Sequence, residues 1–330
     1  MADMQSLKRW VAQQLDSNAE QIEWQPLAGD AGFRRYVRCI RQGQPYMAAI
    51  APPATEKNEA FVQIAELLNQ AGVAAPKVLA VDYQQGFLLQ TDLGDTPLQK
   101  VLNEESVDGY YQQAMQLIAK MQTISSDAIA SYDSAALAVE LSYFKTWFLE
   151  AMLDYACSAQ EENMLDAFFA VLLDSAGSQP QAFVHRDFHC RNIMRLENDT
   201  LACIDFQDAL IGPITYDLAS LLRDCYVVWP DEKVYAWLEL YRQQHWPEIA
   251  QQQFKDYFDF MGLQRHIKVL GVFARLSIRD NKHGYLNDLP TVFNYVLQVA
   301  EQQPQAQAFA TWLRQSILPL AQQQSWGKNL

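Results

Sequence analysis

Residues 185–192 read HRDFHCRN, and Ile204-Asp205-Phe206 follows a short distance downstream. Together these residues form the pattern H-x-D-x-x-x-x-N with a second aspartate after it. Transfer of a phosphoryl group from ATP needs such a set. One carboxylate accepts the proton of the attacking hydroxyl, while an amide oxygen and another carboxylate hold Mg²⁺ against the phosphates. The stretch therefore predicts phosphoryl transfer.

The segments around this pattern favour a geometry that serves it. The apolar run 182–184 predicts a short buried strand that leads into the loop. Residues 193–196 and 201–204, joined by the turn-like 197–199, predict a hairpin. Such a hairpin would carry Asp205 back towards Asn192, so that both could reach one cation.

Two other interpretations of the pattern compete with phosphoryl transfer. Asp187, Asn192 and Asp205 could be ordinary turn and strand-end residues. Alternatively, His185, Asp187 and His189 alternate, and on an extended strand they would share one face as the ligands of a hydrolytic metal would. The remaining histidines lie in helical patterns without paired-ligand spacing, so phosphoryl transfer is favoured.

Composition excludes several classes of partner. The chain has 330 residues, a formal net charge of −14 and a pI of about 4.7. Nucleic acids and anionic membranes attract cationic surfaces, so neither is expected as the main partner. With 50% hydrophobic residues, a sizeable core is easily filled.

The cysteines and the N-terminus indicate the compartment. The five cysteines are scattered, without a C-x-x-C pair, which is typical of reduced thiols in the cytoplasm. Residues 1–17 predict an amphipathic helix with Leu7, Trp10, Val11 and Leu15 on one side, not a signal peptide. No apolar run approaches the ~18 residues of a membrane span. We expect a cytoplasmic monomer.

The hydrophobic patterns change character once along the chain. Strands are predicted at 22–27, 33–40, 46–50, 78–82 and 86–90, with one helix at 56–70 that ends before Gly72. Helices then dominate, at 106–125, 140–155, 161–175, 215–226, 231–245, 251–279 and 289–302. The pattern predicts an α+β, bilobal, protein-kinase-like fold. It has a nucleotide-binding lobe at 1–91, a hinge at 92–97 and a larger helical lobe at 98–330 that carries catalysis and the substrate, with ATP in the cleft.

The candidate nucleotide residues lie in two segments of the first lobe. Gly29, Asp30, Gly32 and Phe33 lie between the first two strands, where glycines let backbone amides approach phosphate oxygens. Arg34 and Arg35 follow at once. In the second segment, the backbone of Gln90, Thr91, Asp92 and Leu93 suits pairing with the adenine edge. In each segment, a purely structural role is the alternative.

The third predicted strand lacks the lysine with which kinases grip ATP. It reads YMAAIA at 46–51. Lys57, Arg34 and Arg35 are the candidates to replace it, and the sequence does not choose among them. Glu59, on the following helix, is the natural ion-pair partner for such a cation, although it could equally be a solvated helix charge.

The motif and its surroundings resemble the aminoglycoside phosphotransferase-like family of small-molecule kinases over nearly the whole chain. Within that family, the strings at 29–36, 204–209, 217–224 and 262–271 are most similar to amino-sugar kinases of cell-wall recycling. Protein kinases fit less well, because 206–215 is too short for an activation loop and ends in no A-P-E. Two departures from the pattern are the missing strand lysine and glycine at position 32 in place of serine.

The resemblance implies a function and roles for particular residues. It implies an ATP- and Mg²⁺-dependent kinase that converts N-acetylmuramate and N-acetylglucosamine to their α-1-phosphates in peptidoglycan recycling. Asp187 would be the base, and Asn192 and Asp205 the Mg²⁺ ligands. His185 and Asp217 would support the catalytic loop. The candidate sugar ligands are Arg223, Asp224, Arg265 and Lys268.

An excess of positive charge at 265–283 bears on the substrate independently of the resemblance. This stretch holds Arg265, His266, Lys268, Arg275, Arg279, Lys282 and His283 in an acidic chain. It could receive the carboxylate of N-acetylmuramate, or its cations could pair with nearby acids such as Asp280. The rival functions are a kinase of the same fold for an aminoglycoside, choline or homoserine, and a non-catalytic nucleotide-binding regulator.

Overall fold

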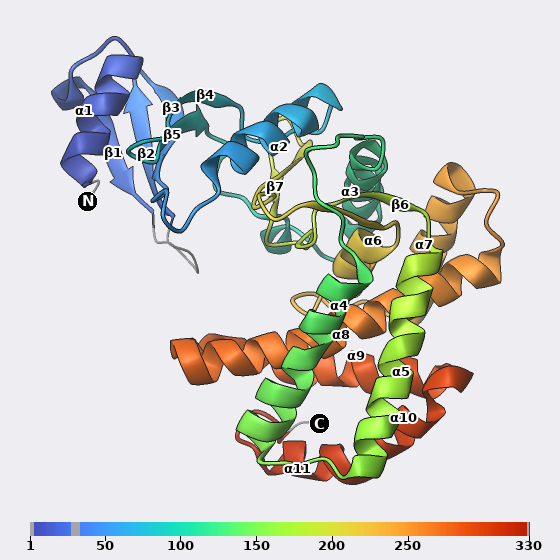
Figure 1. Cartoon of the computed structure of the whole chain (residues 1–330). Coiled ribbons are helices and arrows are strands. Elements are labelled where there is room, and N and C mark those ends of the chain that lie inside the picture. Colours follow the sequence, from blue (N-terminus) through green and yellow to red (C-terminus); the bar gives the residue numbers. More distant parts are fainter. Residues whose placement is uncertain (1–2, 28–33, 329) are drawn as a thin grey trace. The chain divides into compact units, whose positions relative to one another are not determined.

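The computed structural model describes residues 3–27, 34–328 and 330 (Figure 1). The chain divides into two compact units. The first unit comprises Met1–Ile124 and Arg191–Ala209, and the second comprises Ser125–Cys190 and Leu210–Leu330. The chain thus passes between the units inside the stretch 185–192. The hinge expected at 92–97 would separate the nucleotide-binding lobe from the catalytic lobe, and this division stays a prediction.

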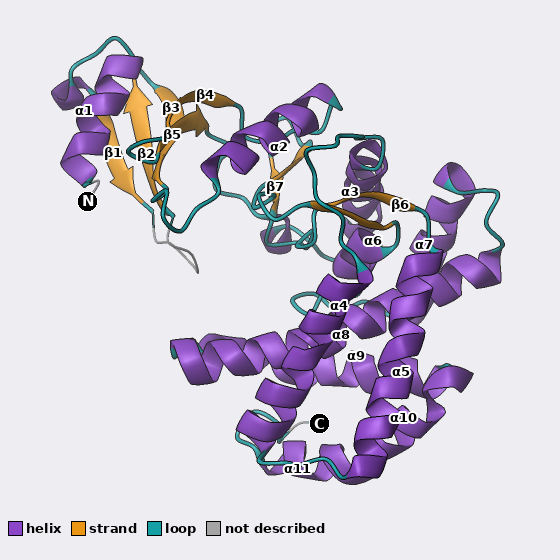
Figure 2. Ribbon diagram, in the orientation of Figure 1, coloured by secondary structure: helices purple, strands orange, loops and turns teal. Residues whose placement is uncertain are grey.

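The first unit is built on an antiparallel sheet of five strands in the order β1-β2-β3-β5-β4 (Figure 2). The strands are β1 Glu23–Pro26, β2 Arg35–Arg41, β3 Gln44–Ile50, β4 Val78–Asp82 and β5 Phe87–Thr91. Gln42 and Gly43 connect β2 to β3, both with positive φ (51° and 80°). A tight two-residue hairpin loop needs this backbone conformation, because it matches the twist of the flanking strands.

One face of this sheet packs on the N-terminal helix. Helix α1, Met4–Gln14, begins at Asp3, whose carboxylate accepts the Ser6 amide at 2.7 Å. Leu7 and Val11 of α1 join Val37, Cys39, Ala48, Ile50, Phe87 and Leu89 in one buried cluster. Because side chains alternate along a strand, Tyr36, Arg38 and Ala49 lie on the opposite face.

The rest of the first unit includes the hairpin after the motif. Its helices are α2 Asn58–Gln70, the 3₁₀ turn η2 Leu98–Lys100 and α3 Val107–Met121, and its further strands are β7 Ile193–Arg195 and β8 Leu201–Cys203. Strand β8 lies next to the segment after α2, since the Cys203 amide donates to the Ala74 carbonyl at 2.9 Å. The Phe206 ring stacks on the Phe61 ring of α2, with centroids 4.9 Å apart.

The second unit is mostly helical. Its elements are α4 Ser134–Tyr143, η3 Phe144–Met152, α5 Ala159–Ser178, β6 Gln181–Val184, β9 Leu210–Pro213, α6 Tyr216–Leu222, α7 Asp231–His245, α8 Gln251–Asp280, η4 His283–Asp288, α9 Leu289–Gln302, η5 Pro304–Ala306, α10 Gln307–Trp312, η6 Leu313–Ile317 and α11 Leu318–Gln323. Helix α8 contributes Leu263, Ile267 and Leu270 to the largest buried cluster.

A glycine fixes how closely α8 approaches α4. A Cβ on Gly271 would lie 2.4 Å from the Tyr143 carbonyl oxygen, well inside van der Waals contact. Only a residue without a side chain fits here, so the backbones of α8 and of the α4–η3 junction are in direct contact. Strands β6 and β9 form a separate antiparallel pair, with Val184 opposite Leu210.

Most predicted elements are confirmed, and the errors are local. Strand β4 and helices α7 and α9 have the predicted bounds, and the hairpin after the motif is present. The helix predicted at 140–155 is wrong as a single α-helix, because α4 ends at Tyr143 and a π-helix continues it. The prediction missed β9 and the helices after residue 306. In the described part of the chain, no helix is both long and apolar enough to cross a membrane.

Candidate active site

A buried carboxylate holds the beginning of the motif. Strand β6 ends at Val184, and Asp217, at the first turn of α6, accepts the backbone amides of His185 (2.7 Å) and Arg186 (3.0 Å). Burial raises the pKa of Asp217, while the charge of His185 and these two amides act against the rise. These hydrogen bonds are the ones expected of a residue that orients the loop. His185 itself is fully buried.

Arg186 has a backbone conformation that is rare for a side-chain-bearing residue. Its φ is 75°, in the left-handed region, which costs on the order of 1–3 kcal/mol and must be compensated by surrounding contacts. Asp217 binds its amide, and its guanidinium pairs with Glu140 at 2.6 Å and lies over the Tyr132 ring. The turn presents Asp187 immediately afterwards.

Asp187 lies in a positively charged environment. Its surroundings remove water and would raise the pKa of its carboxyl group, but the positive charges of Lys268 and Arg265 outweigh this and lower it. The side chain is nevertheless accessible at the surface of the second unit. Asp187 is therefore an ionised carboxylate at neutral pH, which is the state that a proton acceptor needs.

The strongest of these charges belongs to a buried network around Glu140. Glu140 on α4 accepts from Lys268 of α8 at 2.8 Å, from Arg186 and from the Tyr132 hydroxyl. Burial would raise the pKa of Glu140, but Lys268 and the other donors lower it. Burial would likewise lower the pKa of Lys268, but Tyr216 and Glu140 raise it. Both partners are thus charged.

The second part of the motif belongs to the first unit, where the hairpin brings Asn192 and Asp205 together. The Asn192 amide nitrogen lies 3.4 Å from Asp205 Oδ2, and the Ile204 amide donates to the Asn192 carbonyl at 3.0 Å. Asp205 has a φ of 66°, and Gln207 donates to its Oδ1 at 2.8 Å. The predicted proximity of Asn192 and Asp205 is therefore found.

This pair fits a magnesium ion by its chemistry. Mg²⁺ prefers oxygen ligands and is usually bound by one or two carboxylates plus phosphates and water. Asp205 is exposed and supplies a carboxylate, and the Asn192 side chain carries an amide oxygen on the same group that faces it. Within the described ranges, no three His, Cys, Asp or Glu side chains lie close enough together to hold a metal ion.

The predicted nucleotide-binding residues differ in burial and in hydrogen-bond partners, and some of them lie outside the described residues. Gly29, Asp30, Gly32 and Phe33 lie outside the described residues. Arg35 is exposed. The other four lie at the end of β5 and just beyond it. Gln90 is buried, the Thr91 hydroxyl accepts the Lys77 amide, Asp92 pairs with Arg38, and Leu93 is partly exposed. Their contact with a nucleotide stays a prediction.

An arginine joins the sheet to the segment predicted as the hinge. Arg38 of β2 binds both Asp92 and Asp95, with Nη1 2.6 Å from Asp95 Oδ2. The two carboxylates raise the pKa of Arg38 further above its usual value. Since Asp92 and Asp95 follow β5, this pairing fixes the course of the chain as it leaves the sheet.

Of the four candidate sugar ligands, three are occupied by other parts of the protein. Arg223 is buried and binds Asp231 at 2.9 Å and Tyr235 at 3.0 Å. Asp224 accepts the amides of Cys190 and Tyr226. Lys268 pairs with Glu140.

The fourth candidate, Arg265, is also buried. Burial opposes its charge, while Tyr216, Cys225, Asp187 and Asp224 raise the pKa of its guanidinium. It therefore lies among the groups that surround Asp187. Binding of a sugar by any of the four residues stays a prediction.

Two residues that matter in the structure escaped the sequence prediction. Glu140 is an ordinary helix carboxylate in the sequence, and only the fold brings it to Arg186 and Lys268. In the first unit, Glu59 was the expected ion-pair partner, but it is exposed, and Glu56 pairs with Arg34 at 3.1 Å. The residue pattern gave no signal for Glu140. The only signal for Glu56 is its position two residues before the first residue of α2, Asn58.

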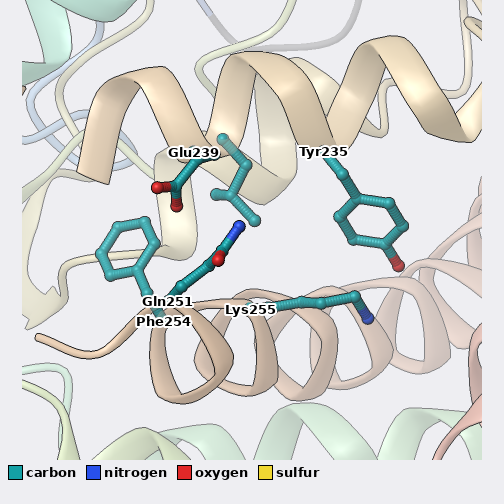
Figure 3. A pocket seen from close by; sticks show the side chains of 6 residues that line it. Tyr235, Glu239, Gln251, Phe254 and Lys255 are labelled. Atoms are coloured by element: carbon teal, nitrogen blue, oxygen red, sulfur yellow. The ribbon is translucent and has the colours of Figure 1, made fainter. Parts of the chain in front are cut away.

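A small cavity in the second unit lies between two helices. Figure 3 shows it between α7 and α8, with Tyr235, Glu239, Gln251, Phe254 and Lys255 around a space of about 40 Å³. This volume holds a water molecule or two, and no predicted site residue lines it. It is a packing gap between two helices, so the motif and not this cavity locates the site.

Comparisons with known proteins agree with the predicted family and fold. Residues 23–251 match the model of the phosphotransferase enzyme family, and this chain belongs to that family. The sequence is 35% identical to an N-acetylmuramate/N-acetylglucosamine kinase of Pseudomonas putida, over 92% of this chain and 93% of the relative. It is 37% identical to the enzyme of the same name from Pseudomonas aeruginosa, over 85% and 84% of the two chains.

Solved structures define the fold. The choline kinase of Streptococcus pneumoniae superposes with a TM-score of 0.65 at 14% identity, covering 89% of this chain and 99% of that one. An aminoglycoside phosphotransferase in ternary complex with ADP and hygromycin B gives 0.60 at 13% identity, covering 88% and 98%. The predicted aminoglycoside phosphotransferase-like fold is confirmed.

Proposed function

We propose that this chain is an ATP- and Mg²⁺-dependent kinase that phosphorylates the anomeric hydroxyl of N-acetylmuramate and N-acetylglucosamine, giving the α-1-phosphates. The observation that carries the proposal is the identity of 35–37% over most of the chain with kinases named for these two sugars. The residues of the H-x-D-x-x-x-x-N pattern and the downstream aspartate supply the chemistry.

Asp187 acts on the acceptor hydroxyl. Its carboxylate orients the sugar hydroxyl and accepts the proton late, as the sugar oxygen forms its bond to the γ-phosphorus and the bond to the ADP oxygen breaks. The cations around Asp187 keep it ionised, and Asp217 fixes the turn that presents it. The accepted proton then passes to solvent.

Asn192 and Asp205 would hold the metal. When bound, Mg²⁺ neutralises charge on the phosphates of the nucleotide. The hairpin of β7 and β8 fixes the separation of these two side chains, and Gln207 binds the second carboxylate oxygen of Asp205. The hairpin therefore keeps the two side chains close together, as the binding of one ion by both of them requires.

The biological setting is part of the same proposal. A kinase that uses ATP and these sugars fits peptidoglycan recycling in the cytoplasm, where ATP is made. The five cysteines are all free thiols, which agrees with a reducing compartment. We expect a monomer, which size-exclusion chromatography with light scattering will test.

The rival substrates are choline, aminoglycosides and homoserine. Choline and aminoglycosides are cationic, and the positive charges of Lys268 and Arg265 near Asp187 oppose their binding. A panel of sugars and amino alcohols, screened for ADP release, separates all of these from the proposal. No ADP release with any acceptor would favour a non-catalytic regulator.

Product analysis tests the position of the phosphate. A 1-phosphate has no reducing end, and its anomeric proton couples to phosphorus in NMR spectra. A product that still reduces copper reagents carries its phosphate on another hydroxyl and contradicts the anomeric assignment.

A further inference from the structure

The strand that carries the phosphate-binding lysine of kinases has no cation here. Kinases place a lysine on the third strand and pair it with a glutamate of the following helix. In β3 of this chain, Ala49 lies on the sheet face opposite α1, and its cross-strand partner is Tyr36 of β2. A different residue must therefore supply the positive charge.

We propose that Arg34 is the cation that binds the nucleotide phosphates, with Glu56 as its ion-pair partner. This inference rests on the proposed function and names a residue of the same nucleotide site. Arg34 directly precedes β2 and directly follows the glycine-containing segment 28–33, which the sequence predicts to approach phosphates.

Contacts of Arg34 hold its guanidinium in one place. The side chain is 7% exposed, and Nη2 lies 3.1 Å from Glu56 Oε2. The guanidinium carbon lies 4.4 Å from the centre of the Phe61 ring of α2. An ion pair on one side and an aromatic face on the other fix a planar group that is suited to phosphate.

The same contacts connect Arg34 to the metal-binding segment. Phe61 stacks on Phe206, the residue after Asp205. Burial raises the pKa of the Tyr36 hydroxyl, the charge and hydrogen bonding of Arg34 act against this rise, and the charges of Asp205 and Glu56 add to it. Tyr36 thus shares one neighbourhood with Arg34, Glu56 and Asp205, where Mg²⁺ and phosphates would meet.

The guanidinium of Arg34 has an N–H group that is available to donate a hydrogen bond to an anion. Among the described residues, Nε of Arg34 is buried without a hydrogen-bond acceptor, while Nη2 is held by the ion pair with Glu56. Buried donors normally have partners, and a phosphate oxygen would provide one. Arg38 lacks this capacity because Asp92 and Asp95 already surround it.

The other candidates from the sequence fit less well. Arg35 and Lys57 are exposed, and Arg35 alternates with Arg34 and Tyr36 along the chain. Glu59 is exposed as well. Neither Arg35 nor Lys57 has an ion pair within the described ranges, so neither is held in position as Arg34 is.

Calorimetry of nucleotide binding tests the role of Arg34 without any sugar. ATP, ADP and adenosine are titrated in the presence of Mg²⁺ into the wild type, Arg34→Met, Arg34→Lys and the control Arg41→Met at the far end of β2. We expect Arg34→Met to weaken ATP and ADP binding by roughly 10- to 100-fold and to leave adenosine binding unchanged. Arg34→Lys keeps the charge but not the planar fork, so its loss should be smaller.

Several outcomes would overturn the assignment of Arg34. One such outcome is a ratio of ATP affinity to adenosine affinity that is unchanged in the folded Arg34 variants. Another is a loss of ATP affinity in Arg35→Met or Lys57→Met instead of in Arg34→Met. If Arg34→Met does not fold, as judged by circular dichroism, the ratio in Arg34→Lys decides. If the wild type binds ATP but phosphorylates neither sugar, the proposed function is contradicted. The calorimetric test of Arg34 would still decide its role in nucleotide binding.

Discussion

The Lys268 ammonium lies 2.8 Å from Glu140 Oε1, and the two side chains are only 15% and 10% exposed. This ion pair joins α8 to α4. It involves Lys268, which the sequence analysis named as a candidate sugar ligand. The partner of Lys268 is therefore Glu140, a carboxylate of the protein itself. The positive charge of Lys268 also lowers the pKa of Asp187. We predict that Lys268 helps to keep Asp187 ionised, and its contact with a sugar stays a prediction as well.

Replacing Lys268 should shift the pH dependence of catalysis. The cations now hold the pKa of Asp187 below its usual value against the effect of burial, so the active, ionised form persists to low pH. In Lys268→Met the effect of burial is opposed less strongly, the pKa of Asp187 rises, and the acid limb of kcat/KM should move to higher pH. The control is Lys255→Met, which removes a lysine of the same helix that pairs with Asp259. An acid limb that stays in place would refute the role of Lys268.

Replacing Asp187 should abolish most of the catalytic rate. Asp187→Asn keeps the shape of the side chain and removes proton acceptance, so kcat should fall by roughly 10²- to 10⁴-fold with nucleotide affinity nearly intact. Asp174→Asn, on the exposed surface of α5, serves as the control for general effects. Near-normal kcat in a folded Asp187→Asn protein would remove this residue from the mechanism.

Replacing Asp205 should uncouple nucleotide binding from magnesium. Asp205→Ala removes the only carboxylate of the Asn192–Asp205 pair, so ATP affinity measured by calorimetry should no longer depend on Mg²⁺. The matched control, Asp199→Ala, changes a carboxylate of the same hairpin that binds Arg195 at 2.6 Å. If Asp205→Ala retains the metal dependence of the wild type, the ion is bound elsewhere.

The sequence predicted the features that depend on local patterns. Turn residues between two apolar runs specify the β7–β8 hairpin, and with it the approach of Asn192 to Asp205. Helical periodicity likewise predicted the bounds of α7 and α9 correctly. The π-helix after Tyr143 escaped because its apolar residues satisfy an ordinary helical period almost as well. Strand β9 escaped because it is short and contains Gly212 and Pro213.

Features that depend on distant pairing could not be predicted in this way. Glu140 meets Arg186 and Lys268 only because α4, the turn after β6 and α8 converge. Arg34 and Arg35 are neighbours in the sequence, and only the fold shows that Arg34 packs against Phe61 while Arg35 is exposed. Glu56 and Glu59 differ in a similar way, since only Glu56 reaches the arginine.

Discrimination between the two sugars should depend on Arg265 if this residue binds the carboxylate of N-acetylmuramate. A charge-assisted hydrogen bond to a carboxylate is worth on the order of 1.5–3 kcal/mol, about ten- to a hundredfold. In Arg265→Ala, kcat/KM should fall selectively for N-acetylmuramate, with N-acetylglucosamine as the internal control. In Lys268→Ala, both sugars should be affected equally. An equal fall in Arg265→Ala would assign this residue to maintaining the charge of Asp187 instead.

The glycine at position 271 has a consequence for how this enzyme can vary. Lys268 and Gly271 are one helical turn apart on α8, as are Glu140 and Tyr143 on α4, so the contact of Gly271 with Tyr143 sets the spacing at which Lys268 meets Glu140. A single added methyl group at Gly271 would push the helices apart and lengthen that ion pair. The working pH range of the enzyme could thus be retuned from a position whose own close contacts are with the backbone of Tyr143 and Phe144.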